Sequence, residues 1–261
     1  MQEEWKCSNT SMIAKVARPK AREHRPVALT NAGYKLFMGV LKERMVVQVM
    51  SDVRVGHLQL GFTSGRRLEE NLFILEYCVE ESYRMKKKLV ALAIDFRKAF
   101  DSVDRGALVK ALMYFKCDPR VIEVIVKLFK GDITNIYREG RHMGEVEVRR
   151  GIRQGCTGSP QLFIMVVAMI IEQLLRSGLG FRMDGLYMPV LFYADDGMLL
   201  AERVGEAEGM LDILESVGGQ FGLEINKEKS YCLVFNGEEI ERDQIGGVKV
   251  EIGRASCRER V

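Results

Sequence analysis

The chain has 261 residues and a formal net charge of +3, and 47% of its residues are hydrophobic. This length suits one large domain or two small ones with a buried core, and so small a charge neither indicates nor excludes a nucleic-acid partner. None of the six cysteines forms a Cys-x-x-Cys pair, and the longest apolar run, Leu162–Ile171, is well short of the ~20 residues that span a membrane. With no signal peptide in MQEEWKC, we expect an intracellular protein, nuclear or cytoplasmic, that contacts no membrane.

The N-terminal third combines a basic segment with two amphipathic helices. Lysines and arginines dominate Met12–Arg25, where Pro19 and the neighbouring Pro26 favour an extended or looped path. Apolar residues then recur at helical spacing over Asn31–Val49. A glycine-rich turn and a second amphipathic helix follow in GFTSGRRLEENLFILEYCVEESYRMKKK. A solvated loop is the alternative interpretation of the basic segment.

Capping residues bound the helices in the middle of the chain. Ser102 or Asp104 can cap one helix, and Asp118, followed by a proline, begins the next. Residues then alternate in patches over Ile133–Arg149, as expected of a hairpin whose turn contains Gly140.

The C-terminal half contains two further helices and a short strand. An apolar helix from Ser159 to Arg176 should lie buried across the back of a sheet, because it is apolar nearly all round. Val204–Val217 reads as a helix that Gly218 and Gly219 end, and Tyr231–Phe235 reads as a strand.

Carboxylates directly follow two apolar stretches that are predicted to be buried strands. Leu89–Ile94 reads as a buried strand that Asp95 interrupts. In VLFYADDGMLLA, strands on either side of an Asp-Gly turn would set Asp195 and Asp196 at a hairpin tip. Carboxylates that approach one another repel, and a hard dication such as Mg²⁺ is the natural counterweight. Taken alone, an Asp-Gly turn is ordinary turn chemistry.

The carboxylates belong to four blocks that follow one another along the chain: AIDFRKAFDSVD, GIRQGCTGSPQLF, FYADD and GLEINKEKS. In this order and at these spacings they resemble the palm motifs of reverse transcriptases, and most closely those of non-LTR (LINE-type) retrotransposons. Upstream, RPVALTNAGYKLF and GFTSGRRLEENLF resemble the fingers blocks of that family. The resemblance covers roughly Met12 to Phe235.

The resemblance implies an α/β (α+β) fold, namely a right-hand polymerase palm with an antiparallel sheet backed by helices, plus fingers. The fingers would occupy residues 1–88, and the palm residues 89–250 with a fingers insertion near residues 118–150. Neither the family's primer-grip hairpin nor its thumb is visible in the sequence. We expect residues 251–261 to be a tail outside the fold, because IGRASCRERV resembles the translation of a sequencing adapter.

The activity that the resemblance implies is RNA-directed DNA polymerisation. The 3′-hydroxyl of a primer attacks the α-phosphate of a deoxynucleoside triphosphate (dNTP), and pyrophosphate leaves. Asp95 and Asp195 would hold two Mg²⁺ ions, or Mn²⁺, with Asp196 supporting the ion on the primer side. Lys229 would protonate the pyrophosphate, with Lys227 as its rival. The expected partners are an RNA template, a DNA primer and the dNTP.

Other positions match family residues that surround the incoming nucleotide. Lys15 and Arg25 would grip the triphosphate, Arg25 through its bidentate guanidinium. Phe100 would close against the 2′-position of the sugar, where a core phenylalanine is the alternative. Gln154 and Gly155 would line the nascent base pair, where a generic glycine-rich loop is the alternative.

Two other functions are compatible with these motifs. The chain could be a catalytically inactive or domesticated fragment that only binds nucleic acid, although its palm motifs are undamaged. It could also derive from a group II intron or a related cellular reverse transcriptase, which the form of the fingers blocks argues against. Nucleic-acid binding without primer extension would favour the first of these alternatives.

Overall fold

The computed structural model describes residues 3–14, 17, 20, 24–49, 58–63, 65–236 and 244–251. The chain divides into two compact units, each assembled from two separate stretches. Unit 1 comprises Met1–Asp52 and Phe100–Val166, and unit 2 comprises Val53–Ala99 and Val167–Val261. The predicted boundaries follow the linear sequence instead, so the division into fingers at residues 1–88 and palm at residues 89–250 stays a prediction.

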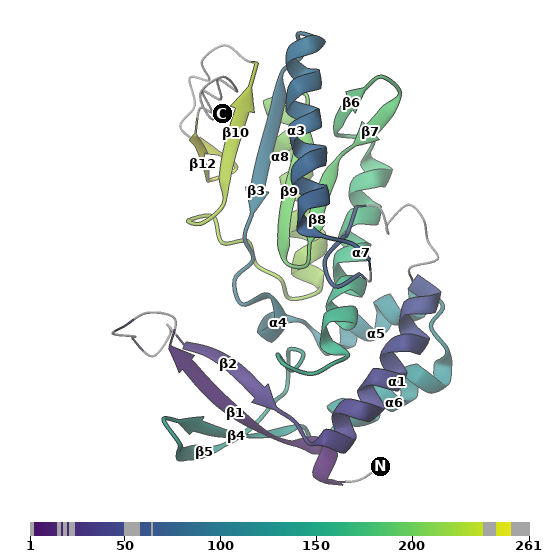
Figure 1. The fold of residues 1–261 in the computed structure, drawn as a ribbon, viewed down its shortest axis with the longest axis vertical. Coiled ribbons are helices and arrows are strands. Elements are labelled where there is room, and N and C mark those ends of the chain that lie inside the picture. The colour runs from purple at the N-terminus through teal and green to yellow at the C-terminus, as the bar shows by residue number, and fades with distance from the viewer. Residues whose placement is uncertain are drawn as a thin grey trace. The chain divides into compact units, whose positions relative to one another are not determined.

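Unit 1 contains a mixed four-stranded sheet in the order β2-β1-β4-β5 (Figure 1). The strands are β1 (Cys7–Ala14), β2 (His24–Leu29), β4 (Ile133–Arg138) and β5 (Arg141–Glu147). Pro26 lies in β2, which is an edge strand, where a missing N–H is tolerated. Glu139 and Gly140 both have positive φ between β4 and β5, which is the type I′ pattern and confirms the predicted hairpin.

Aspartate caps fix where two helices of unit 1 begin. The helical segments in or at the edge of this unit are a 3₁₀ turn, η1 (Glu3–Lys6), and the helices α1 (Ala32–Val49), α4 (Ala99–Ser102), α5 (Arg105–Tyr114) and α6 (Pro119–Phe129). Asp104 accepts a hydrogen bond from the Ala107 N–H at 2.7 Å, so Asp104 is the cap and Ser102 is not. Asp118 caps α6 as predicted, by accepting a hydrogen bond from the Arg120 N–H at 2.9 Å.

Unit 2 is built on a six-stranded sheet in the order β11-β12-β10-β3-β9-β8 (Figure 1). Its strands are β3 (Leu89–Ile94), β8 (Val190–Tyr193), β9 (Asp196–Ala201), β10 (Tyr231–Phe235), β11 (Gln244–Ile245) and β12 (Val248–Glu251). A separate hairpin pairs β6 (Phe181–Met183) with β7 (Leu186–Met188). β3 lies between β9 and β10 and runs antiparallel to both, which confirms the predicted buried strand.

The β11–β12 hairpin extends this sheet beyond the last predicted strand. β12 pairs in parallel with β10, and its last residue, Glu251, pairs with Leu233. The strand therefore reaches the first residue of the predicted tail. Residues 252–261, which resemble the adapter translation, lie outside the described residues.

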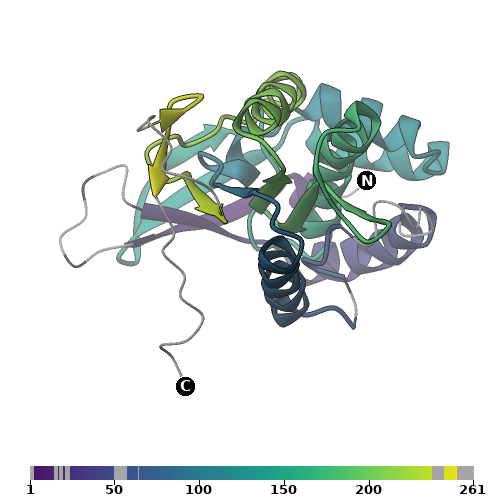
Figure 2. The same ribbon diagram turned by 90° about the horizontal axis from the view of Figure 1, so that it is seen from above.

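Helices cover both faces of the unit 2 sheet. Figure 2 shows α3 (Leu68–Arg84) against one face and α8 (Val204–Gln220) against the other. Cys78 and Val79 of α3 join a buried cluster with Leu89 and Ala91 of β3. The intervening residue of β3, Val90, is also fully buried and points to the opposite face, since side chains alternate along a strand. This mostly antiparallel sheet, backed by helices, has the predicted fold class.

The end of α8 differs from the prediction. The helix continues through Gly218 and Gly219 to Gln220. Each glycine costs a helix about 1 kcal/mol relative to alanine, which burial of an apolar face outweighs. Gly218 is itself buried, and a Cβ atom there would make only ordinary van der Waals contacts with Leu223 and Ile170. The chain leaves the helix where Gly222 adopts a φ of +80°.

The apolar helix α7 (Ser159–Ser177) begins in unit 1 and continues in unit 2. Among the described residues it is the one helix long and apolar enough to cross a membrane. Two thirds of its apolar stretch, however, is buried inside the protein. Burial of a helix that is apolar nearly all round is typical of a core helix, as predicted.

Candidate active site

The hairpin between β8 and β9 carries two of the predicted catalytic aspartates. Tyr193 pairs with Asp196, so the two-residue turn consists of Ala194 and Asp195. Only the first of these has positive φ, at 59°, which is the type II′ pattern. The predicted Asp-Gly turn was therefore wrong, because Gly197 lies within β9 and pairs with Ile94.

Gly197 is required by packing and not by the turn. A Cβ atom at this position would overlap the ring of Phe192 on the neighbouring strand. The glycine that follows Asp196 is thus explained by packing against Phe192 and not by the conformation of the turn. The hairpin brings Asp195 to the turn itself and Asp196 to the first position of β9.

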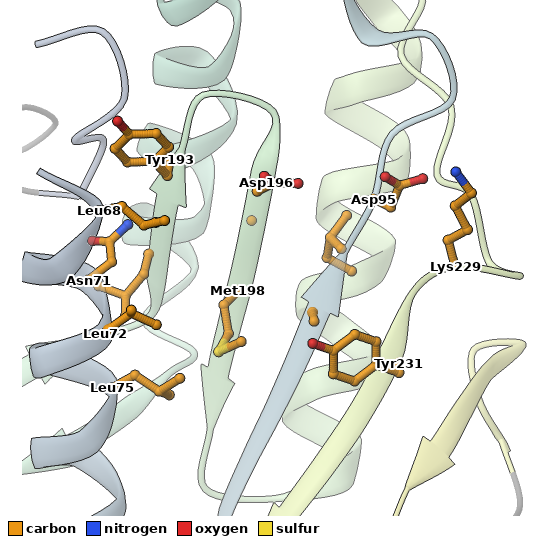
Figure 3. Close-up of a pocket in the computed structure, with 14 residues that line it drawn as sticks. Leu68, Asn71, Leu72, Leu75, Asp95, Tyr193, Asp196, Met198, Lys229 and Tyr231 are labelled. Atoms are coloured by element: carbon orange, nitrogen blue, oxygen red, sulfur yellow. The ribbon is translucent and has the colours of Figure 1, made fainter. Parts of the chain in front are cut away.

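The register between β3 and β9 brings Asp95 to Asp196. The ladder pairs Val90 with Ala201 and ends with Ile94 opposite Gly197. Asp95 and Asp196 are the residues directly beyond this last pair, and both line the same cavity. Figure 3 shows both carboxylates at the same end of the sheet, on the side that α3 covers. Residues about a hundred positions apart in the sequence therefore share one site.

The carboxylates influence one another electrostatically. The pKa of Asp196 is raised above its ordinary value, first because neighbouring protein atoms displace water from it and then because Asp195 and Asp95 repel its negative charge. A divalent cation bound to hard oxygen ligands would relieve this repulsion, so the donor set fits Mg²⁺. Within the described part of the chain, no three His, Cys, Asp or Glu side chains already form a compact ligand group.

Two residues of the GLEINKEKS block hold Asp95 in place. The Asn226 side chain donates a hydrogen bond to Asp95 Oδ2 at 2.9 Å, and its main-chain N–H donates to the Asp95 carbonyl at 2.8 Å. The Asp95 N–H in turn donates to the hydroxyl of Ser230 at 3.1 Å. Sequence reasoning missed both residues. Both residues belong to the GLEINKEKS block, but only its lysines were predicted to act at the site.

The two lysines of this block have different surroundings. Lys229 lines the same cavity as Asp95 and Asp196. Lys227 instead forms an ion pair of 2.8 Å with Glu215 of α8. Of the two candidates for proton donor, only Lys229 is thus beside the carboxylates.

A cavity of about 520 Å³ lies in front of the carboxylates, within unit 2 (Figure 3). Leu68, Leu72 and Leu75 of α3 form one wall, and strand residues such as Met198 and Tyr231 form the floor. Asp95, Asp196 and Lys229 thus line one end of a mainly apolar trough. Such a site can accept an apolar ring while the Lys229 ammonium group faces a phosphate.

In unit 1, the predicted nucleotide-binding residues lie on adjoining segments. Arg25 is an exposed residue of the edge strand β2. Three residues further along β2, the Ala28 N–H donates a hydrogen bond to the Gln154 carbonyl at 2.8 Å. Gly155 has a φ of +100°, and a Cβ atom there would come within 2.8 Å of the Ala28 carbonyl oxygen. Lys15, the other predicted triphosphate ligand, lies outside the described residues.

Phe100, the predicted sugar gate, is partly buried in unit 1. Its ring stacks on that of Phe163, with ring centroids 4.7 Å apart. Its carbonyl accepts a hydrogen bond from the Ile152 N–H at 2.9 Å, just before the predicted base-pair residues. A stacked ring is compatible both with a core residue and with a gate, so the role of Phe100 stays a prediction.

A buried ionic network anchors the glycine-rich loop that contains Gln154. Asp132 is almost inaccessible to solvent and forms ion pairs with Arg105 and Arg153. Arg153 also donates to the Lys6 carbonyl at 2.7 Å, and Arg105 donates to the Gly151 carbonyl at 2.8 Å. Arg153 therefore has a structural role although it belongs to the GIRQG motif. Nothing in the local sequence indicates its pairing with Asp132.

Comparison with known proteins assigns the chain to a family. The family model described as "Reverse transcriptase (RNA-dependent DNA polymerase)" matches residues 14–246. The chain belongs to the reverse transcriptase family. The match spans most of the chain and includes every described residue predicted to act at the site.

Two relatives confirm the predicted type of reverse transcriptase. The chain is 28% identical over 217 residues to the Pol polyprotein of type-1 retrotransposable element R2 of Bradysia coprophila, covering 82% of this chain and 24% of that protein. It is 25% identical over 213 residues to an uncharacterized 149 kDa protein of transposon TX1 of Xenopus laevis, covering 80% and 16% respectively. The chain thus resembles non-LTR retrotransposon Pol proteins and spans about a quarter or less of their length.

Solved structures support the same fold. A Candida tropicalis telomerase truncated from its C-terminal domain has a TM-score of 0.65 at 12% identity, covering 93% of this chain and 52% of that one. A Candida albicans telomerase in complex with a TWJ fragment of telomeric RNA has a TM-score of 0.63 at 13% identity, covering 92% and 44%. At such identities the likeness shows the right-hand polymerase fold alone.

Proposed function

We propose that this chain carries the catalytic centre of an RNA-directed DNA polymerase of a non-LTR retrotransposon. Such an enzyme transfers a nucleotidyl group from a dNTP to the 3′-hydroxyl of a primer. One observation carries the proposal. Asp95 and Asp196 lie directly beyond the last pair of the β3–β9 ladder and line one cavity, next to Asp195 in the turn, within a chain of the reverse transcriptase family.

Asp95, Asp195 and Asp196 would hold two Mg²⁺ ions, with Mn²⁺ as the alternative, which would stabilise the attacking and leaving oxygens of the transfer. The chain's own residues prepare the remaining chemistry. Asn226 fixes the orientation of the Asp95 carboxylate through the 2.9 Å hydrogen bond. Lys229, at the same end of the trough, would give a proton to the leaving pyrophosphate.

Residues of unit 1 would bind the incoming nucleotide. Arg25 would pair with the triphosphate, and Lys15 would assist it. Gln154 and Gly155 would contact the nascent base pair, on a loop that is bonded to β2 through the Gln154 carbonyl. Phe100 would exclude a 2′-hydroxyl and so select deoxynucleotides.

The partners we propose are an RNA template and a DNA primer. The telomerase of similar fold from Candida albicans was solved with an RNA fragment. An A-form duplex can be recognised through its shape and backbone without reading of base edges. The apolar trough beside Asp95 would accommodate the end of the primer strand. We propose that this reaction takes place inside the cell, in the nucleus or the cytoplasm.

A charge substitution at the catalytic turn tests the proposal. Asp195→Asn keeps the size of the side chain and removes its charge, so Mg²⁺-dependent primer extension on an RNA template should fall by at least ~10³-fold. Asp212→Asn, which alters an exposed aspartate of α8, is the matched control and should extend normally. Extension that survives Asp195→Asn would refute the assignment. Gel-shift binding without extension by the unmodified chain would favour a nucleic-acid-binding fragment instead.

A further inference from the structure

A short segment before α3 lies directly against the catalytic hairpin. The Phe192 N–H donates a hydrogen bond to the Leu58 carbonyl at 2.7 Å, and the Leu60 N–H donates to the Phe192 carbonyl at 3.0 Å. These bonds align residues 58–61 with β8 as a short parallel bridge. The segment is far from the hairpin in the sequence, yet both belong to unit 2.

The side chain of Gln59 in this segment is completely buried and binds the catalytic turn. Its Nε2 donates to the Ala194 carbonyl at 3.1 Å, and its Oε1 accepts from the Ala194 N–H at 3.0 Å. The same Oε1 accepts from the Gly61 N–H at 2.9 Å. One carboxamide thus satisfies both main-chain polar groups of Ala194, the residue that immediately precedes Asp195.

The close approach of this segment to the turn depends on a glycine. A Cβ atom at Gly61 would overlap the main-chain nitrogen of Ala194, so the main chains touch directly. Ala194 needs such support because it has a φ of 59°, a region that residues with a Cβ atom rarely occupy. A residue holds such a conformation only when its surroundings determine it, and here those surroundings are Gln59 and Gly61.

A second amide supports the hairpin two residues before Ala194. The Asn71 side chain donates a hydrogen bond to the Phe192 carbonyl at 3.1 Å and is itself buried. Neutral amides from two segments thus hold the main chain on the approach to Asp195. Neither amide binds the carboxylate of Asp195 in the described structure, which stays available for ligands.

We propose that Gln59 is a positioning residue that fixes the Ala194–Asp195 turn and, through it, the direction of the Asp195 carboxylate. This inference rests on the proposed function, since Asp195 is assigned there to the chemistry. The side-chain hydrogen bonds of Gln59 go to main-chain atoms of Ala194 and Gly61, so its role would be exerted through the turn. Loss of its bonds should therefore impair the chemical step while binding of nucleotide and nucleic acid is retained.

Hydrogen exchange of the unmodified chain tests the hydrogen bonds between Gln59 and Ala194 without any mutation. The Ala194 N–H sits in a two-residue hairpin turn, where an amide without a partner exchanges rapidly. Its bond to a fully buried Oε1 should instead give it protection comparable with that of β3 amides such as Leu92. Rapid exchange at Ala194 would overturn the proposal, whatever the activity of the chain.

Substitution of Gln59 then tests its effect on the reaction. Gln59→Met keeps the length of the side chain and removes all three hydrogen bonds. Ser82→Ala is the matched control, because it also removes a buried hydrogen bond of unit 2, one that is internal to α3. We expect Gln59→Met to accelerate exchange at Ala194 and to lower kcat for primer extension ~10–100-fold, with KM for dNTP changed less than about twofold. Ser82→Ala should change neither exchange at Ala194 nor kcat.

The outcomes separate this inference from the proposed function. An unmodified chain whose Ala194 N–H is protected but which extends no primer would refute the proposed function. The exchange result would still establish the hydrogen bonds between Gln59 and Ala194. An active chain whose kcat is unaffected by Gln59→Met would refute the positioning role. Equal losses of kcat in Gln59→Met and Ser82→Ala would also refute it, because general destabilisation would then explain both.

Discussion

The glycine-rich loop of unit 1 and the catalytic turn of unit 2 are both irregular segments, and each is held by residues remote in the sequence. The loop is held by charge, because Arg105 and Arg153 converge on the buried carboxylate of Asp132. The turn is held by the neutral amides of Gln59 and Asn71.

The difference follows from what each segment has to present. The loop offers main-chain atoms and the Gln154 side chain, which carry no net charge. The ion pairs of Asp132 therefore do not alter the groups that the loop presents. The turn offers carboxylates, and a guanidinium beside them would neutralise the charge that a cation needs. Asp95 fits the same principle, since it is held by the Asn226 amide and the Ser230 hydroxyl. Neutral supports fix direction while they leave the carboxylate charge available.

The largest expected effect comes from breaking the charged support. Asp132→Asn leaves two buried guanidinium groups without a counter-ion and should lower the free energy of unfolding by about 3–5 kcal/mol. Urea denaturation followed by circular dichroism measures this loss. Asp184→Asn is the control, because Asp184 forms an exposed ion pair with Arg84 and should matter by less than about 1 kcal/mol. If both variants lose the same small amount, the network does not anchor the loop.

The sequence predicted those features of the catalytic centre that depend on local patterns. The apolar run of β3 ending at Asp95 and the existence of a hairpin at Asp195 were both evident, because continuous apolar runs and the residues that interrupt them act over a few positions, although the turn residues were wrong. The cap at Asp118 was also readable for the same reason, and Asp104 was one of the two candidates for the other cap. Family motifs then linked these pieces into one site.

The supports could not be predicted, because each depends on tertiary register. Gln59 bonds Ala194 because residues 58–61 align with β8. Asn226 bonds Asp95 because β10 pairs with β3. The β11–β12 hairpin was missed because strands of two and four residues carry little alternation. Gly197 was assigned to the wrong role, since its true constraint is a ring on the neighbouring strand.

A second prediction concerns that constraint at the catalytic hairpin and has an intermediate expected effect. Gly197→Ala drives a Cβ atom into the Phe192 ring and should cost about 1–3 kcal/mol of unfolding free energy. Phe192→Leu makes room, so the alanine should cost at least ~1 kcal/mol less in that background than in the unmodified chain. A double-mutant cycle by urea denaturation gives this coupling. A coupling near zero would mean that glycine is needed for its main-chain conformation and not for packing.

The smallest expected effect on stability belongs to Asn226, where the main loss should be in activity. Asn226→Ala removes one partly buried hydrogen bond, worth about 1 kcal/mol, and frees the Asp95 carboxylate to rotate. Residues that orient a metal-binding carboxylate typically contribute 10–100-fold to metal affinity or activity, so primer extension should fall by that factor and need more Mg²⁺.

Asn236→Gly is the matched control for Asn226→Ala. It also removes a carboxamide of unit 2, one that donates to the Ser82 and Lys87 carbonyls at the other end of β10, and glycine suits the φ of 50° at this position. The two variants should lose similar stability, and only Asn226→Ala should change the Mg²⁺ dependence. Were both to shift it alike, the neutral amides would serve the fold in general and not the direction of the catalytic carboxylates. The contrast with the charged network of unit 1 would then reduce to a difference in burial.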